Sequence, residues 1–371
     1  MIIFRYLARQ ILMSTVAVSL VLTLIIVSGR FIKFLSYVVA GELSPEFVFQ
    51  LVAYRIPGML VLILPLGLFL GVLLALGRMY LESEMVVLRA SGMSSGKLAR
   101  FALGPALLVS AVVALLSLYL SPLSWQQVEQ IYEQESKKSE LDNLTPGRFH
   151  SLRGGSRTSY TSAYDGDEKE LSFVFVSERD EKTGQLRVVV AEAGRQVITN
   201  PETQERFVVL EKGFRYDGEP GRADYTEIAF QEYGFLMPPS QGYQRPAKID
   251  ALTLSELMAI DDSEHRAELH WRLSMPLLAL IITLIAVPMS KTNPRQGRYA
   301  KLIPSILLYM TYLTLLTGAK GAIDDGKMGV ISLWLIHLGF FLFALSLLFG
   351  DRFWERVANL MPRLPQRSKS S

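Results

Sequence analysis

Three long apolar segments, then a polar stretch with strand patterning over residues 121–262, then three more apolar segments make up this chain. An α-helix needs about 20 mostly apolar residues to cross the hydrocarbon of a bilayer. Segments of sufficient or nearly sufficient length cover residues 11–27 (continuing toward 36), 49–76, 101–120, 271–289, 302–317 and 329–349. The layout therefore predicts an α-helical membrane protein with six transmembrane helices and one inserted water-soluble domain. The first segment is too long for a signal-peptide core and lacks a small-residue cleavage site, so an uncleaved anchor is expected.

Composition supports this division. Apolar residues make up 50% of the chain although 20% of the residues are charged, so the average combines nearly charge-free spans with a charge-rich insert. The net charge of +3 is too small to indicate a nucleic-acid partner. The absence of cysteine excludes disulfides, thiolate metal sites and a cysteine nucleophile.

The basic residues of the short loops predict the orientation, because cytoplasmic loops are enriched in Lys and Arg. The loops at residues 37–45 and 318–327 are poor in them. The alternate loops and the two ends hold Arg5 and Arg9; Arg78, Arg89, Lys97 and Arg100; Lys291, Arg295, Arg298 and Lys301; and Arg352, Arg356, Arg363, Arg367 and Lys369. Both termini are therefore expected in the cytoplasm and the inserted domain outside it.

The insert has the pattern of an all-β domain. Runs rich in β-branched and aromatic residues at 171–176, 186–190, 207–210 and 225–230 are separated by turn sequences. Strands at this spacing favour a sandwich or jelly roll. Residues 126–140 are expected to form a solvated helix, 238–249 a linker, and 253–269 a helix that returns to the membrane.

The run at 171–176 has apolar residues on both faces. Phe173 and Phe175 share one face, and Val174 and Val176 the other. A central strand covered on both sides explains this pattern. A hydrophobic trough for lipid chains explains it as well, with Phe173, Phe175, Val188 and Tyr225 as its candidate lining.

Two strings that suggest catalysis do not fit their surroundings. Residues 92–96 match the G-x-S-x-G pattern of a nucleophile elbow, but they follow a helical segment instead of a strand. The same stretch lacks one residue and the Ser or Thr of a phosphate-binding loop, so an energy source must come from a partner. His265 and His270 have no carboxylate at metal-ligand spacing. No catalytic residue, metal site or cofactor is predicted.

Two segments invite a functional interpretation. Gly67 and Gly71 form a G-x-x-x-G face that permits close helix approach, either within the chain or between subunits. In the loop after the second span, Leu81, Met85 and Leu88 form one helical stripe, with Glu84 and Arg89 as polar groups beside it. Such a short amphipathic helix could rest on the lipid interface, or it could be a lever that an ATPase pushes.

Arg30 and Lys33 lie one turn apart at the outer end of the first span, against the positive-inside trend. A charged residue costs about 2.5–3.5 kcal/mol at the centre of the bilayer and less near its surface. Both side chains could extend to lipid headgroups, or they could bind a phosphate-bearing substrate at the outer leaflet.

Several strings together resemble a known family. They lie at residues 1–7, 64–71, 76–84, 90–92, 266–272, 287–290 and 293–298. In these strings the chain resembles the LptF/LptG permeases of the lipopolysaccharide exporter, and the LptF branch most closely. The strings occur in order through the whole chain, whereas the insert matches in type and position more than in sequence.

The resemblance implies a permease subunit with domains at residues 1–120 (coupling loop 78–100), 121–262 (periplasmic β-jellyroll) and 263–371 (three helices and a basic cytoplasmic tail). Two such permeases pair and bind a dimeric cytoplasmic LptB-type ATPase and a single-span LptC-type protein. The complex extracts lipopolysaccharide from the inner membrane and passes it to a periplasmic bridge of jelly rolls. On this basis Glu84 sits in the helix that docks into the ATPase, and Arg30 and Lys33 face the substrate's phosphates. The jelly roll either carries lipid chains or only docks the LptC-type partner.

Two rival interpretations remain. A permease of the lipoprotein-releasing or macrolide-exporter kind has a cytoplasmic string similar to residues 88–94, but its soluble domain follows the first of four spans, whereas here the insert follows the third of six. A membrane-anchored scaffold for envelope assembly would not need a docking loop.

Overall fold

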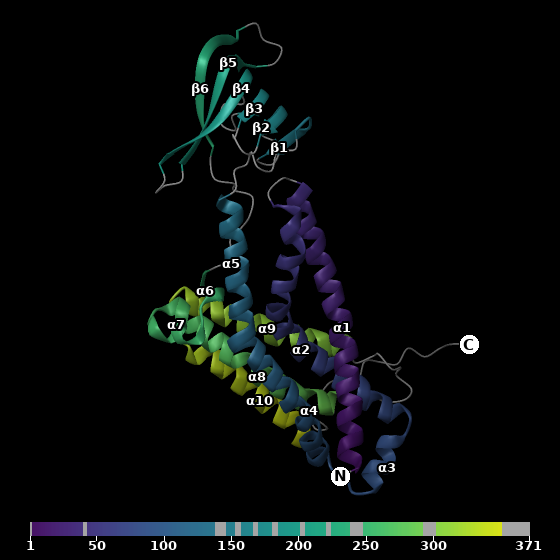
Figure 1. Ribbon diagram of the computed structural model, residues 1–371. Coiled ribbons are helices and arrows are strands. Elements are labelled where there is room, and N and C mark those ends of the chain that lie inside the picture. The colour runs from purple at the N-terminus through teal and green to yellow at the C-terminus, as the bar shows by residue number, and fades with distance from the viewer. Residues whose placement is uncertain are drawn as a thin grey trace, which may run out of the picture. The chain divides into compact units, whose positions relative to one another are not determined.

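The computed structural model describes residues 2–39, 43–137, 146–152, 157–165, 170–179, 185–200, 205–219, 224–237, 248–291 and 302–350 (Figure 1). Six helical segments in this part of the chain are long and apolar enough to cross a membrane, which confirms the predicted number of spans. They are Ile2–Val39, Pro45–Leu81, Ser95–Gln134, Ser263–Met289, Leu302–Asp324 and Ile331–Phe349.

The helices are α1 (Ile2–Val39), α2 (Val48–Leu81), the short α3 (Glu84–Ala90), α4 (Ser95–Leu115), α5 (Ser121–Lys137), α6 (Lys248–Ala251), α7 (Leu254–Ala259), α8 (Ser263–Met289), α9 (Leu302–Asp324) and α10 (Ile331–Phe349). A 3₁₀ turn at Pro45–Phe47 precedes α2, and a π-helical segment at Leu116–Leu120 joins α4 to α5 without a break.

The chain divides into two compact units. The first, called the bundle here, contains Met1–Val27, Arg55–Gln126 and Ala247–Ser371. Within it α8 packs against α4, α9 and α10. The core of α8 consists of small and branched residues such as Ala279, Ile282 and Ala286, which are fully buried. Small residues let helix backbones approach closely, which is how helices associate in a bilayer.

The predicted helix at 253–269 is two helices. The Thr253 hydroxyl and the Glu256 carboxylate form a reciprocal capping box that starts α7, and the Asp262 carboxylate accepts from the His265 N–H to start α8. Each cap satisfies backbone donors that a helix start leaves without partners. The sequence therefore contains two helix starts, and the intervening residues adopt extended conformations.

The second unit contains Ser28–Tyr54 and Gln127–Pro246. Its six strands are β1 (Phe149–Leu152), β2 (Arg157–Asp165), β3 (Glu170–Arg179), β4 (Leu186–Asn200), β5 (Glu205–Gly218) and β6 (Thr226–Met237). All four predicted strand runs lie in this sheet. The strands pair antiparallel in chain order, as a meander (Figure 1). The predicted all-β domain inserted between the helices is therefore confirmed.

The sheet has a line along which strand pairing is interrupted. The ladder skips one residue on each strand from β2 to β6, namely Ser162, Phe173, Glu192, Lys212 and Gln231. Phe173 and Lys212 have positive φ values of 44° and 49°. Burial changes phase across this line, since Leu171, Val174 and Val176 are buried while Ser172 is exposed. The buried apolar side chains therefore lie on one face of the sheet. They form a core of Leu171, Val174, Val176, Val189, Ala191, Val208 and Leu210.

Candidate functional site

The short helix α3 lies in the loop between the second and third spans. Ser83 has a positive φ of 60° and separates α3 from α2. Gly92, two residues after the end of α3, has a φ of 86°, which suits glycine. Its N–H donates to the Arg89 carbonyl of the last turn. The chain therefore makes a separate seven-residue helix here.

The predicted apolar stripe of this loop spans two helices instead of one. Leu81 ends α2, whereas Met85 and Leu88 belong to α3. Met85 is fully buried, and Leu88 packs against the same core. The opposite side of α3 carries Val86 and Val87, which are 65% and 66% exposed. The helix is thus anchored by one apolar face and presents a second one outward.

The two polar groups of this loop are both bonded within the chain. The Tyr6 hydroxyl, at the start of α1, lies 3.2 and 3.0 Å from the two carboxylate oxygens of Glu84 and donates to them. The Arg89 Nη2 donates to the Tyr80 hydroxyl at 3.1 Å. Sequence analysis did not find Tyr6, because the hydrogen bond joins residues 78 positions apart.

Arg30 and Lys33 are exposed on α1, about 50 residues before α3 in the sequence. The Lys33 Nζ is 5.9 Å from the centre of the Tyr37 ring. Phe31, between them, packs its ring 5.6 Å from that of Phe49. In the described part of the chain, no carboxylate pairs with either cation. Two exposed cations three residues apart form a basic patch that can accept an anion.

Gly67 and Gly71 face α1 of the same chain. A Cβ on Gly67 would lie 1.9 Å from the Ser19 Oγ, and a Cβ on Gly71 would lie 2.8 Å from the Thr15 Cα. Thr15 and Ser19 belong to a buried stripe of α1 that contains one residue in every four, namely Leu7, Ile11, Thr15 and Ser19. Close packing within the chain therefore accounts for this glycine pair without a contact between subunits.

The bundle contains a buried charged cluster that the sequence did not lead us to predict. The Glu268 carboxylate accepts from the Arg272 Nε at 2.6 Å and from the Lys320 Nζ at 2.6 Å. The remaining Arg272 nitrogens donate to three carbonyls, of Leu252 at 2.7 Å, Ile249 at 3.0 Å and Asp250 at 3.1 Å. The i, i+4 spacing of an acid and a base in an otherwise apolar span was the available signal.

This cluster fastens the segment that returns from the inserted domain. Arg272 holds α6 and the residue after it onto α8, and Gln126 of α5 donates to the Ala251 carbonyl at 2.9 Å. Burial raises the pKa of the Asp250 carboxyl, and the Glu268 carboxylate raises it further. Residues 248–262 therefore belong to the same compact unit as α8.

The candidate trough residues do not line the buried face of the sheet. Neighbours along a strand point to opposite faces of the sheet. Val176 and Val189 are paired and buried, so their neighbours Phe175 and Val188 point to the other face. Phe173 sits on the line of interrupted pairing and is 48% exposed, and Tyr225 precedes β6 and is 60% exposed. Within the described residues, β3 is covered on one face only. The other face carries an aromatic group, Phe149, Tyr160, Phe173 and Phe175, with ring centres 4.8 to 6.2 Å apart.

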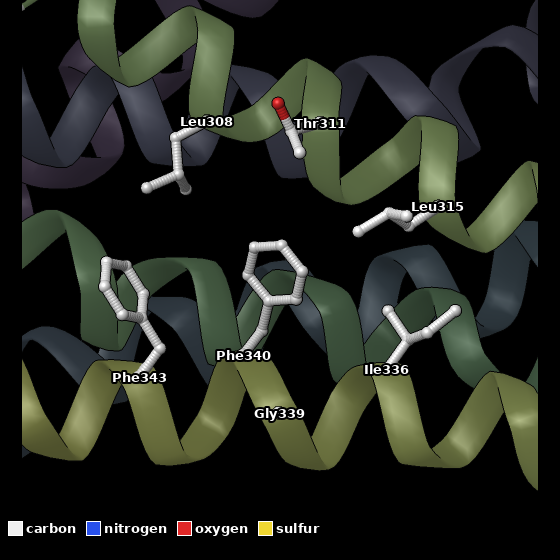
Figure 2. A pocket seen from close by; sticks show the side chains of 7 residues that line it. All are labelled: Leu308, Thr311, Leu315, Ile336, Gly339, Phe340 and Phe343. Carbon is white, nitrogen blue, oxygen red and sulfur yellow. The ribbon is translucent and has the colours of Figure 1, made fainter.

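An apolar groove of roughly 530 Å³ lies between α9 and α10. Figure 2 shows Leu308, Thr311 and Leu315 of α9 directed toward Ile336, Phe340 and Phe343 of α10, and Gly339 lies on α10. The hydroxyl of Thr311 donates to the Leu307 carbonyl at 2.8 Å. The groove therefore offers apolar surface and no unsatisfied polar group to a headgroup.

Comparison with known proteins agrees with this arrangement. Residues 5–349 match the family model described as "Lipopolysaccharide export system permease LptF/LptG". The chain is similar to the "Lipopolysaccharide export system permease protein LptF" of Escherichia coli (strain K12), with 30% identity over 359 residues that cover 96% of each chain. The proteins of the same name from Escherichia coli O157:H7 and Shigella flexneri have the same identity and coverage.

Proposed function

The chain belongs to the LptF/LptG family of lipopolysaccharide export permeases, and from this premise we propose that it is the non-catalytic membrane subunit of an ATP-driven complex that extracts lipopolysaccharide from the inner membrane. The observation that carries the proposal is the similarity to LptF over 96% of both chains. The complex would include a second, LptG-type permease, a cytoplasmic ATPase dimer and a single-span LptC-type protein. Both termini would lie in the cytoplasm and the β domain in the periplasm.

Helix α3 is the proposed contact with the ATPase. Its buried Met85 anchors it to the bundle, while Val86 and Val87 are exposed beside Glu84. An apolar surface next to a carboxylate would fit a groove on the ATPase that offers apolar contacts and a basic group. A carboxylate has about four acceptor positions, so Glu84 can bond to Tyr6 and still accept from a partner's Lys or Arg.

Arg30 and Lys33 are the proposed contacts with the phosphates of the lipopolysaccharide headgroup. Their exposure and the absence of a carboxylate partner within the described residues leave both charges available to an anion. The proposed role needs the charge of each side chain and not the bidentate geometry of Arg. Replacing both with Asp should reduce cross-linking of substrate to α1 while the complex still assembles. Poor assembly of the double variant would instead make the pair a structural anchor.

The β domain has two candidate roles in onward passage. It carries lipid chains, or it only docks the LptC-type protein by strand addition at a sheet edge. Photo-cross-linkers at Phe173, Phe175, Val188 and Tyr225 sample surface outside the packed core. Lipopolysaccharide adducts that require ATP would support passage, whereas adducts to the LptC-type protein alone would assign a docking role.

The function is tested by purifying the tagged chain from detergent and by reversing the charge of Glu84. An ATPase subunit and a second six-span permease should accompany the wild-type chain. Glu84→Lys should lose the ATPase or uncouple ATP hydrolysis from lipopolysaccharide release. Normal release by Glu84→Lys at ordinary protein levels would refute the role of α3, and purification without an ATPase would favour the scaffold interpretation.

A further inference from the structure

Tyr6 links the helix α3 to the start of α1. Its hydroxyl donates to the Glu84 carboxylate, with oxygen–oxygen distances of 3.2 and 3.0 Å. A hydrogen bond to a charged group is among the stronger kinds in proteins. The Tyr6 side chain is 39% exposed, so the core does not depend on this ring. The contact joins two elements that are separated in sequence by the whole of α2.

The same end of α1 is held by packing on two further sides. Leu7 and Ile11 are each 1% exposed and share the core of the bundle with Met85 of α3. The Phe4 ring meets the Phe101 ring of α4 edge to face at 5.7 Å. A displacement of α3 therefore acts on α1 through contacts on neighbouring turns.

The remainder of α1 contains fewer buried residues, of which Phe34 is 3% exposed. After Ser19, most residues of α1 are exposed or half-buried, and Arg30 and Lys33 are exposed. The helix runs without a break from Ile2 to Val39. The stretch from Tyr6 to Arg30 is about 36 Å long at 1.5 Å per residue. A helix that is unbroken and fixed at its first turns can carry a movement along its length.

We infer that Tyr6 is a positioning residue: its hydroxyl orients the Glu84 carboxylate and couples α3 to α1, so that a movement of α3 changes the position of Arg30 and Lys33. This inference rests on the proposed roles of Glu84 and of the basic pair. It adds a connection through α1 itself, in addition to the covalent connection through α2. The coupling is mechanical, and no covalent step is involved.

The test uses the complete complex with its ATPase, in proteoliposomes that contain lipopolysaccharide. Lipopolysaccharide released per ATP hydrolysed is measured for the wild type, Tyr6→Phe, Glu84→Gln, the Tyr6→Phe/Glu84→Gln double variant and Glu84→Lys. Tyr119→Phe is the matched control, because it removes a hydroxyl from another exposed tyrosine in the helical spans. Bound ATPase and the thermal midpoint are measured for every variant.

Tyr6→Phe should lower the release per ATP about threefold or more, as expected for loss of one charged hydrogen bond at a partly exposed site, with bound ATPase and thermal midpoint unchanged. The double variant should be no worse than Glu84→Gln, because both changes remove one contact. A wild-type ratio for Tyr6→Phe together with a defective Glu84→Lys would overturn this inference and leave the proposed function intact. Losses that multiply in the double variant, or loss of bound ATPase in Tyr6→Phe, would also overturn it. A normal Glu84→Lys would refute the proposed role of α3 as well.

Discussion

Arg272→Met should destabilise the bundle more than any single change at an exposed charge. The side chains of Arg272 and Glu268 are only 4% and 6% exposed, and their closest approach is 2.6 Å. Methionine preserves length and apolar volume but leaves the Glu268 carboxylate with Lys320 as its remaining cation. It also removes the donors to the carbonyls of Ile249, Asp250 and Leu252.

Breaking a buried ion pair by removing one partner costs about 3–5 kcal/mol. We expect the lower end, about 3 kcal/mol, because Lys320 still neutralises Glu268. A shift of about 2 °C or more per kcal/mol for a unit of this size corresponds to a fall of at least about 6 °C in the thermal midpoint. The thermal midpoint of Arg272→Lys should lie between those of the wild type and Arg272→Met. An ammonium group keeps the positive charge but cannot reach all four acceptors at once.

Thermal unfolding in detergent, compared at one scan rate, provides the assay. Arg266→Met is the matched control on the same helix: its ion pair with Asp261 joins side chains that are 53% and 88% exposed, and such pairs contribute about 0–1 kcal/mol. If Arg272→Met and Arg266→Met had the same midpoint, the buried cluster would not hold α6 on α8.

Gly71→Ala should lower stability by about 1–3 kcal/mol, because its methyl group would meet the backbone of Thr15; Gly77→Ala, which meets open space, should not, and equal midpoints would refute the close packing. The pKa of Asp262 is lowered by hydrogen bonds from the first turn of α8, so its contribution is present above the ordinary Asp pKa and is lost as the pH falls through the lowered value. Hydrogen exchange of the first turn of α8 should therefore accelerate in acid, and Asp262→Asn, which keeps a capping oxygen, should remove that dependence. Lys212→Val should loosen β4 and β5 in hydrogen exchange by about 1 kcal/mol or more, because a β-branched residue strains the positive φ, whereas Lys212→Gly should not.

The spans and most strands could be predicted because each depends on local pattern. A lipid-crossing chain must satisfy its backbone hydrogen bonds within each helix, so length and hydropathy identify the six spans. The runs at 171–176 and 186–190 likewise lie in strands. Helix boundaries were less accurate, because the break at Ser83 depends on one positive φ that no residue type there signals.

The faces of the sheet could not be predicted by simple alternation. A period of two places Leu171 and Val174 on opposite faces, but both are buried because the skipped position at Phe173 shifts the phase of β3. The contacts of the candidate site were also out of reach of local pattern. The Tyr6–Glu84 hydrogen bond spans 78 positions, and the Lys320–Glu268 pair spans 52. Such pairs follow from helix packing, which hydropathy does not specify.

The most direct test of the central claim is substrate cross-linking beside the basic pair of α1. Gly29 precedes Arg30, and a side chain there meets nothing within 4 Å, so a photoreactive residue is tolerated; Gly339 on α10 has the same open space and serves as control. In the assembled complex, lipopolysaccharide adducts at position 29 should form, should change in yield with ATP, and should disappear in Arg30→Asp/Lys33→Asp while adducts at 339 do not respond to that change. Adducts at 29 that are the same with and without ATP and in the double variant would contradict ATP-driven extraction of lipopolysaccharide through this site.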